Sequence, residues 1–128
     1  MVEVATQGVR RALSRVPLVV LLAEDDPGLR ALFTLILQGA GHRVMSAPDG
    51  LEALEAAARQ MPDLLVSDLD MPRLDGAGLA HRLLDRHPAM KVLIVSGGDE
   101  RRALGHPFEP KPVSAARLLE RVREVTGS

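Results

Sequence analysis

The sequence predicts an α/β domain in which five parallel strands form one doubly wound sheet with helices on both faces. Short apolar stretches rich in Val, Leu and Ile alternate along the chain with longer segments whose apolar residues recur at helical spacing. The length of 128 residues is also that of one domain, and no linker-like segment interrupts residues 17–126. Strands that alternate with helices form parallel sheets through right-handed crossovers, so that helices cover both faces.

Five stretches are predicted to be strands. The first is continuously apolar, as expected for a strand that is buried on both faces of the sheet. All five have the length of ordinary strands, and they occupy residues 18–23, 42–47, 63–67, 92–95 and 106–109.

Four helices are predicted between and after these strands. Pro is tolerated in a first helical turn, Asp and Ser are good N-caps, and Gly or Pro ends a helix. Asp26 is interpreted as an acid that complements the dipole at the start of the first helix. The boundaries of the four helices are marked by Pro27 and Gly39 to Gly41, by Asp49-Gly50 and Pro62, by Asp75-Gly76 and Pro88, and by Ser114.

One connection is too short for an ordinary helix. Only residues 97–105 separate Ser96, which follows the fourth strand, from the fifth strand, and three of them are glycines, which weaken a helix. We therefore expect the helix of this connection, which is fourth in chain order and additional to the four full-length helices, to be shortened to a single turn or a loop.

The composition excludes several classes of protein. A hydrophobic fraction of 46% and a charged fraction of 26% are those of a globular chain. The net charge of −1 lacks the basic excess of a nucleic-acid-binding domain, and the absence of Trp and Tyr removes stacking platforms for bases. Without cysteine there is no disulfide, thiolate metal site or Cys nucleophile. We expect no direct nucleic-acid binding.

Targeting signals and metal-binding histidines are not predicted. No apolar run is long enough to cross a membrane, and no signal-peptide pattern follows the basic N-terminus, so we expect no membrane insertion and a cytoplasmic location. Four histidines lack metal-ligand spacing and are expected at the surface or in loops: His42, His81, His87 and His106.

Charged and hydroxyl side chains gather where the predicted strands end. In an open parallel sheet, ligands bind beyond the carboxyl ends of the strands. The first strand is followed by Glu24, Asp25 and Asp26, the third by Asp68 and Asp70, the fourth by Ser96, and the fifth by Lys111.

These residue types point to one chemistry. Carboxylates that converge in a crevice repel one another unless some protonate or a cation binds, and hard oxygen ligands in an open site suit Mg²⁺. A lysine and a hydroxyl supply the positive charge and the donor that a transferring phosphoryl group needs. A carboxylate can itself be the nucleophile. The residues therefore predict Mg²⁺-dependent phosphoryl transfer onto an Asp.

The sequence resembles the receiver domain of bacterial response regulators over about residues 18–126. Four segments carry the resemblance, in the right order and with the right strand spacing: 22–27 (LAEDDP), 67–76 (SDLDMPRLDG), 92–96 (VLIVS) and 110–112 (PKP). The resemblance implies a flavodoxin-like strand order of 2-1-3-4-5.

The resemblance also implies the roles of individual residues. Asp68 would be the phosphoacceptor, and Lys111 would pair with Asp68 at rest and with the phosphoryl group afterwards. Ser96 would be the switch hydroxyl that moves toward the phosphate. Phe108 would be the aromatic residue that turns inward after Ser96 has moved. The Mg²⁺ ligands would be Glu24, through a metal-bound water, with Asp25, Asp68 and the backbone carbonyl of Asp70.

The function implied by the resemblance is that of a phosphoacceptor in two-component signalling, not that of an enzyme beyond self-catalysed phosphorylation and dephosphorylation. A histidine kinase or a histidine phosphotransfer protein would donate the phosphoryl group, and the face around the fourth and fifth strands would then change. Two alternatives stay open. One is a phosphatase resembling haloacid dehalogenases, which would use Asp68 and Asp70, and the other is a degenerate receiver that only binds partners.

Residues 1–16 lie outside the receiver pattern, which we assign to residues 17–128. Small apolar residues in this extension fall near a heptad stripe, so it is either a helix that pairs with another chain or an upstream domain, or a frayed tail. A homodimer and a fused upstream domain are therefore both open. The protein either acts as a receiver alone or forms part of a larger regulator or kinase.

Overall fold

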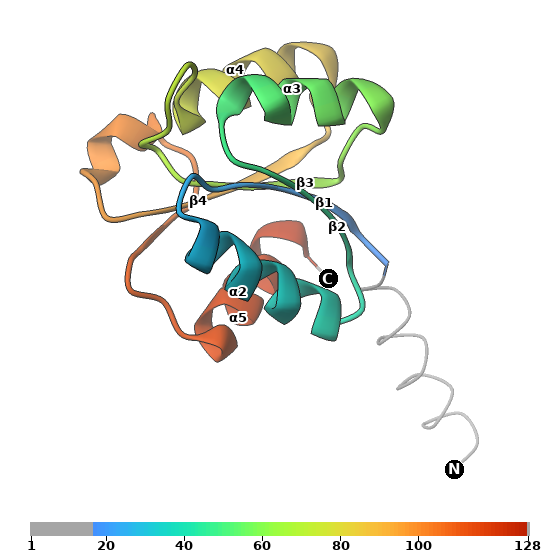
Figure 1. Cartoon of the computed structure of the whole chain (residues 1–128), viewed down its shortest axis with the longest axis vertical. Helices are drawn as coiled ribbons and strands as arrows, with labels where there is room; N and C mark the ends of the chain where they lie inside the picture. The colour runs from blue at the N-terminus through green and yellow to red at the C-terminus, as the bar shows by residue number, and fades with distance from the viewer. Residues whose placement is uncertain (1–16, 128) are drawn as a thin grey trace.

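The computed structural model describes residues 17–127 and shows a sheet between two layers of helices (Figure 1). The predicted extension at residues 1–16 lies outside the described residues. The elements are β1 (Val19–Ala23), α2 (Pro27–Gly39), β2 (Arg43–Ala47), α3 (Gly50–Arg59), β3 (Leu64–Ser67), α4 (Gly76–Arg86), β4 (Lys91–Ser96), the 3₁₀ helix η1 (Glu100–Ala103), β5 (Phe108–Pro110) and α5 (Ala115–Thr126).

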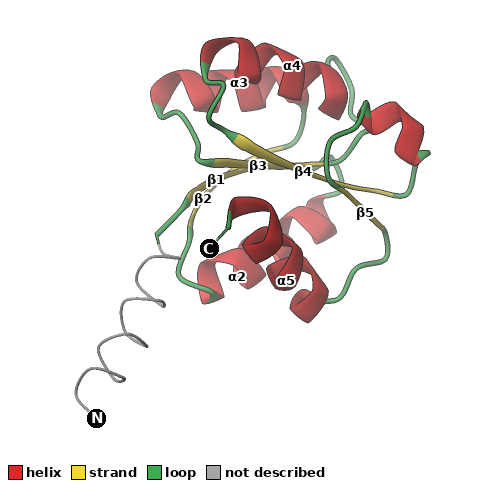
Figure 2. Ribbon diagram, turned by 180° about the vertical axis from the view of Figure 1, so that it is seen from behind, coloured by secondary structure: helices red, strands yellow, loops and turns green. Residues whose placement is uncertain are grey.

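The five strands are parallel and lie in the order β2-β1-β3-β4-β5, which confirms the predicted topology. The chain moves from β1 to one edge of the sheet and then crosses back toward the other edge. Because right-handed crossovers in opposite directions fall on opposite faces, α2 covers one face and α3 and α4 cover the other (Figure 2). After β5 the chain returns to the first face, where α5 lies beside α2.

Two apolar cores result, one on each face of the sheet. Successive side chains of a strand point to opposite faces, so β1 contributes to both cores. Val20 and Leu22 belong to the core that contains the buried residues of α2 and α5. Leu21 and Ala23 belong to the core that contains those of α3 and α4. All four are essentially inaccessible to solvent, as the continuous apolar run predicts.

Side chains cap the helices as predicted. The Asp26 carboxylate accepts from the backbone N–H groups of Gly28 and Leu29 at the start of α2. Asp75 and Ser114 cap α4 and α5 in the same way. A fourth cap, on α3, comes from the aspartate of the predicted Asp49-Gly50 turn. These caps satisfy donors that a helix start otherwise leaves unpaired.

The connection between β4 and β5 contains only the four-residue η1, which agrees with the expectation of a shortened helix. The strand that follows begins at Phe108, two residues later than predicted. The reason is the turn after η1, where Leu104 and Gly105 both have positive φ. The chain reaches the edge of β4 only at Pro107, whose carbonyl accepts from the Ile94 N–H.

Two further expectations concern exposure. Within residues 17–127, no helix combines the length and the apolar character needed to cross a membrane. His42 lies in the loop between α2 and β2, but its side chain is buried, whereas His81, His87 and His106 are exposed or half-buried. The His42 N–H donates to the Leu37 carbonyl, so this loop folds back onto the end of α2.

Candidate functional site

Backbone hydrogen bonds between strands position the predicted site residues at one edge of the sheet. Glu24, Asp68 and Lys111 each come directly after a strand, and each donates its backbone N–H to the last residue of the neighbouring strand. The acceptors are the carbonyls of Ala47, Ala23 and Ser96, and all three N···O distances are 3.0 Å. The parallel register therefore brings together side chains from distant parts of the chain.

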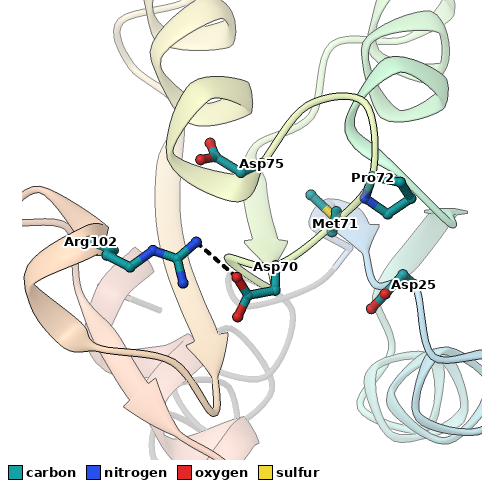
Figure 3. A pocket seen from close by; sticks show the side chains of 6 residues that line it. All are labelled: Asp25, Asp70, Met71, Pro72, Asp75 and Arg102. Atoms are coloured by element: carbon teal, nitrogen blue, oxygen red, sulfur yellow. Dashed lines mark ion pairs between the residues drawn. The ribbon is translucent and has the colours of Figure 1, made fainter.

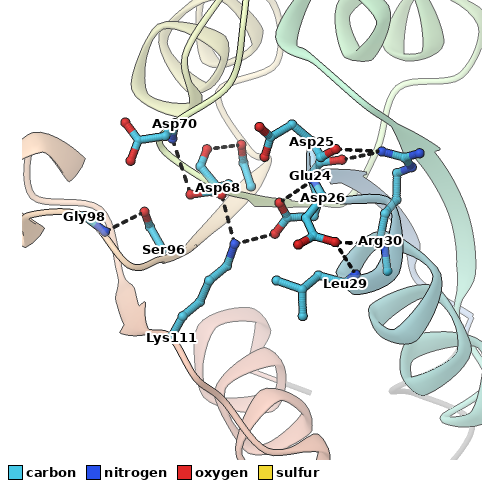
Figure 4. A network of polar contacts seen from close by, with 12 residues as sticks. Glu24, Asp25, Asp26, Leu29, Arg30, Asp68, Asp70, Ser96, Gly98 and Lys111 are labelled. Atoms are coloured by element: carbon cyan, nitrogen blue, oxygen red, sulfur yellow. Dashed lines mark hydrogen bonds and ion pairs between the residues drawn. The ribbon is translucent and has the colours of Figure 1, made fainter.

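The Lys111 ammonium contacts two of the predicted carboxylates (Figure 4). Its Nζ lies 2.6 Å from Glu24 Oε1 and 2.9 Å from Asp68 Oδ2. Only 18% of the lysine side chain is exposed, and the two carboxylates are more deeply buried still. A buried charge requires a partner, so Lys111 and the two acids stabilise one another's charged forms.

The environment shifts the pKa values of these three groups in different directions. Burial raises the pKa of Glu24 above its ordinary value, although the hydrogen bond from Lys111 opposes the rise. Burial also raises the pKa of Asp68, but hydrogen bonding to Lys111 and Ser96 outweighs it and leaves the pKa lowered. For Lys111, burial lowers the pKa, and the hydrogen bonds to Glu24 and Asp68 overcome this effect and raise it. Asp68 is thus held in the carboxylate form.

A third carboxylate completes an acidic cluster. Glu24, Asp25 and Asp68 each offer an oxygen, and these oxygens all lie within 4.8 Å of one another. Asp25 is exposed, so the cluster opens toward solvent on one side. Carboxylate oxygens at this spacing fit a hard divalent cation that keeps part of its water shell. Asp26 is not part of this cluster. Its carboxylate caps the start of α2, in agreement with its interpretation as a helix-start acid.

Each oxygen of the Asp68 carboxylate has a partner. Oδ2 contacts Lys111, and Oδ1 accepts from the Asp70 N–H at 3.3 Å. The Ser96 side chain is completely buried at the end of β4, and its Oγ accepts from the Gly98 N–H at 3.0 Å. These predicted residues therefore lie around one carboxylate.

Phe108 lies apart from this cluster of contacts. It opens β5 opposite Ile94, is half-buried, and packs against the core beneath α3 and α4. The aromatic ring belongs to the core in the state described.

Three residues that the sequence did not mark as functional shape the loop after Asp68. The Arg73 guanidinium makes a two-pronged ion pair with Asp49. Gly76 packs so closely on the loop that a Cβ there would overlap the Asp68 carbonyl oxygen. Arg102 of η1 pairs with the Asp70 carboxylate at 2.8 Å. The glycine that follows Asp75 is a local signal for a tight approach, but the two arginine pairs join distant segments and have no sequence signal.

The fold and this cluster of acids with a lysine define the class of receiver-type α/β domains, and comparison with known proteins leads to the same class. Residues 20–123 match the family model described as the response regulator receiver domain. The chain belongs to this family, which makes it a receiver domain of two-component signalling.

Two curated relatives illustrate the similarity. The chain is 32% identical over 114 residues to the probable transcriptional regulatory protein TcrX of Mycobacterium tuberculosis, an alignment that covers 84% of the chain and 49% of TcrX. It is 33% identical over 113 residues to the DNA-binding transcriptional regulator NtrC of Escherichia coli, with 80% of the chain and 24% of NtrC covered. The chain thus spans half or less of the length of these relatives.

One solved structure shows the same fold around a bound metal. It is the receiver domain of the sensor histidine kinase PA1611 from Pseudomonas aeruginosa, which superposes with a TM-score of 0.79 at 25% identity, over 88% of this chain and 100% of that domain. That domain holds a magnesium ion in its active-site cleft.

Proposed function

We propose that the chain receives a phosphoryl group on Asp68 from a phosphohistidine of a histidine kinase or a histidine phosphotransfer protein. The observation that carries the proposal is the position of the Lys111 ammonium between the Glu24 and Asp68 carboxylates, with Asp25 beside them. The same site then contains a nucleophile held as the anion, a fixed cation, and a set of oxygen ligands. These are the parts that phosphoryl transfer to a carboxylate requires.

The transfer is a displacement at phosphorus. An Asp68 carboxylate oxygen forms the new P–O bond while the N–P bond of the phosphohistidine breaks. The imidazole nitrogen keeps the electron pair of that bond and takes up a proton. Lys111 then pairs with the phosphoryl oxygens in place of the carboxylate, and the Ser96 hydroxyl supplies a further donor.

Magnesium fits the residues present. The carboxylates of Glu24, Asp25 and Asp68 offer three clustered oxygens, and the backbone carbonyl of Asp70 is assigned as a further ligand, with Glu24 acting through a water. When bound, the ion neutralises charge on the oxygens of the transferring group.

The output of phosphorylation is a shift between two states of the β4–β5 face. A phosphoryl group changes this equilibrium only if one state binds it better, and movement of Ser96 toward the phosphate would create such a state. Phe108 opens β5 and is half-buried, so it is the side chain whose turn inward would follow the space left by Ser96.

We assign residues 17–128 to the receiver domain and residues 1–16 to an extension. A homodimer or a fused domain stays open for the extension. In this assignment the chain is a signalling phosphoacceptor, and its own activities are self-phosphorylation and dephosphorylation. Two of its relatives, TcrX and NtrC, are transcriptional regulators. For this receiver domain we propose no direct binding of nucleic acid.

The phosphatase alternative is not favoured by the geometry. Its general acid would be Asp70, and such an acid must carry a proton to the leaving group. The Asp70 carboxylate is instead turned toward the Arg102 guanidinium, in an ion pair of 2.8 Å. A degenerate receiver that only binds partners is the alternative that experiment must exclude.

The test is incubation with acetyl phosphate, with and without Mg²⁺, followed by intact-mass measurement. We expect a phosphoryl adduct that depends on Mg²⁺ and is lost in Asp68→Asn. A folded chain that binds Mg²⁺ but forms no adduct would favour the degenerate receiver. Steady release of phosphate that also requires the Asp70 side chain would favour the phosphatase.

A further inference from the structure

A pocket lined in part by the loop that follows Asp68 is acidic and contains one basic side chain. Its volume is about 370 Å³, and Figure 3 shows the six residues that line it: Asp25, Asp70, Met71, Pro72, Asp75 and Arg102. We call this cavity the acidic mouth. Of the four charged residues that line it, three are carboxylates, and Arg102 is the one cation among them.

Arg102 is held against one of these carboxylates, close to the candidate phosphorylation site. Its Nη2 lies 2.8 Å from Asp70 Oδ1. A Cβ built on Gly98 would lie 3.2 Å from Arg102 Nη1, 3.2 Å from Asp70 Oδ2 and 3.4 Å from Ser96 Oγ. All three atoms therefore surround one point, and the ion pair occupies the space beside Ser96 that a side chain at position 98 would need.

The short η1 brings Arg102 to this position. Asp99 caps η1, and the completely buried Ala103 anchors its end in the core. The residue before this anchor is Arg102, whose side chain is 47% exposed and reaches over Gly98 toward Asp70.

We propose that Arg102 is a positioning residue for the phosphoryl donor. Its positive charge offsets the negative charge of Asp70 and so lowers the electrostatic repulsion that an anionic donor meets in the acidic mouth. The inference rests on the proposed phosphorylation of Asp68. Phosphoryl donors are negatively charged, and a mouth lined by unpaired carboxylates would repel them. The guanidinium of an arginine stays charged in proteins, so this positive charge is present at every pH of the assay.

Acetyl phosphate is a suitable probe because it is a small anion whose transfer needs no partner protein. An Asp68 carboxylate oxygen forms the P–O bond, the bond from phosphorus to the acetate oxygen breaks, and acetate leaves with the electron pair. Arg102 takes no part in these bonds and acts through the charge of Asp70.

The experiment compares initial rates of adduct formation by intact mass at saturating Mg²⁺ and low salt. We expect Arg102→Ala to react about three- to tenfold more slowly than the wild type, since an exposed ion pair has a modest effect. The double variant Asp70→Asn with Arg102→Ala keeps the backbone carbonyl assigned as a Mg²⁺ ligand and changes only the side chain at position 70. Its rate should return to within about twofold of the wild type, because the unpaired carboxylate is gone. The deficit of Arg102→Ala should shrink at high salt.

Arg101→Ala is the matched control. Arg101 lies in the same η1 helix and its loss changes the net charge equally, but it pairs with Asp99 and does not line the acidic mouth. Its rate should equal that of the wild type. Arg102→Lys keeps the charge and should keep most of the rate, and Arg102→Gln replaces the alanine variant if that variant unfolds.

The inference is overturned if Arg102→Ala reacts as fast as Arg101→Ala, if the double variant does not recover, or if the deficit is independent of salt. These outcomes leave the proposed function intact as long as the wild type forms its Mg²⁺-dependent adduct. A wild-type chain that forms no adduct overturns both.

Discussion

An ion pair between Arg73 and Asp49 links the loop after β3 to the start of α3. The Arg73 Nε and Nη2 atoms lie 3.1 and 2.8 Å from Asp49 Oδ2, and Arg73 has a φ of 70°, in the left-handed region. Asp49 also caps α3 by accepting from the Glu52 N–H. One carboxylate therefore secures both a helix start and the loop that carries the residues after Asp68.

The two features of Arg73 can be separated by substitution. Arg73→Ala removes the ion pair but keeps a side chain at positive φ, whereas Arg73→Gly removes the ion pair and the backbone strain. We expect Arg73→Gly to be more stable than Arg73→Ala by about 1 kcal/mol in urea unfolding. Equal stability would show that the loop relaxes out of this conformation.

Gly76 tests the tight packing beneath Asp68. Gly76→Ala would force a Cβ against the Asp68 carbonyl oxygen, so we expect a loss of about 1–3 kcal/mol of unfolding free energy and slower phosphorylation. The control is Gly39→Ala in α2, where a Cβ meets nothing within 4 Å. That substitution should be neutral or stabilising, because alanine is the better helix former. A Gly76→Ala protein as stable as the wild type would contradict the described approach.

Lys111 tests the cation in the site. Lys111→Ala should slow phosphorylation by acetyl phosphate by about 100-fold, because the developing charge loses a preorganised donor. Lys91→Ala is the matched control and should react like the wild type. Lys91 is the other lysine of the sequence, and it is exposed at the start of β4, whereas the site lies at the end of that strand. Intact-mass time courses measure both rates. If Lys111→Ala is phosphorylated less than about threefold more slowly than the wild type, Lys111 has no catalytic role.

His42 predicts a pH dependence of stability away from the site. Burial lowers its pKa below the ordinary value of 6.5, and its Nδ1 has no hydrogen-bond partner among the described residues. As the pH falls through 6.5, the unfolded chain takes up a proton that the folded chain does not, so the folded state loses stability from there down to the lowered pKa.

His42→Leu removes this proton uptake. The free energy of unfolding should therefore shift in favour of the variant as the pH falls from about 8 to about 5, as measured by urea titration at each pH. His81→Gln, on the exposed surface of α4, controls for the loss of an imidazole. A constant difference between wild type and His42→Leu over this range would rule the effect out.

The candidate site was predictable because it depends on strand ends. Apolar runs define the strands, parallel strands end at one edge of the sheet, and Glu24, Asp68 and Lys111 follow those ends directly. Helix caps such as Asp75 and Ser114 were predictable for a similar reason, since a cap acts within one turn of its own position. In both cases the information lies in a few neighbouring residues.

Local patterns were therefore enough to predict the fold class, the shortened β4–β5 connection and the residues that gather at the sheet edge. They could not predict that Arg102 pairs with Asp70, that Arg73 pairs with Asp49 or that His42 is buried. Each of these contacts depends on where a loop or a 3₁₀ helix folds back onto another segment. Such placement follows from the packing of the whole chain, and no local period or spacing encodes it.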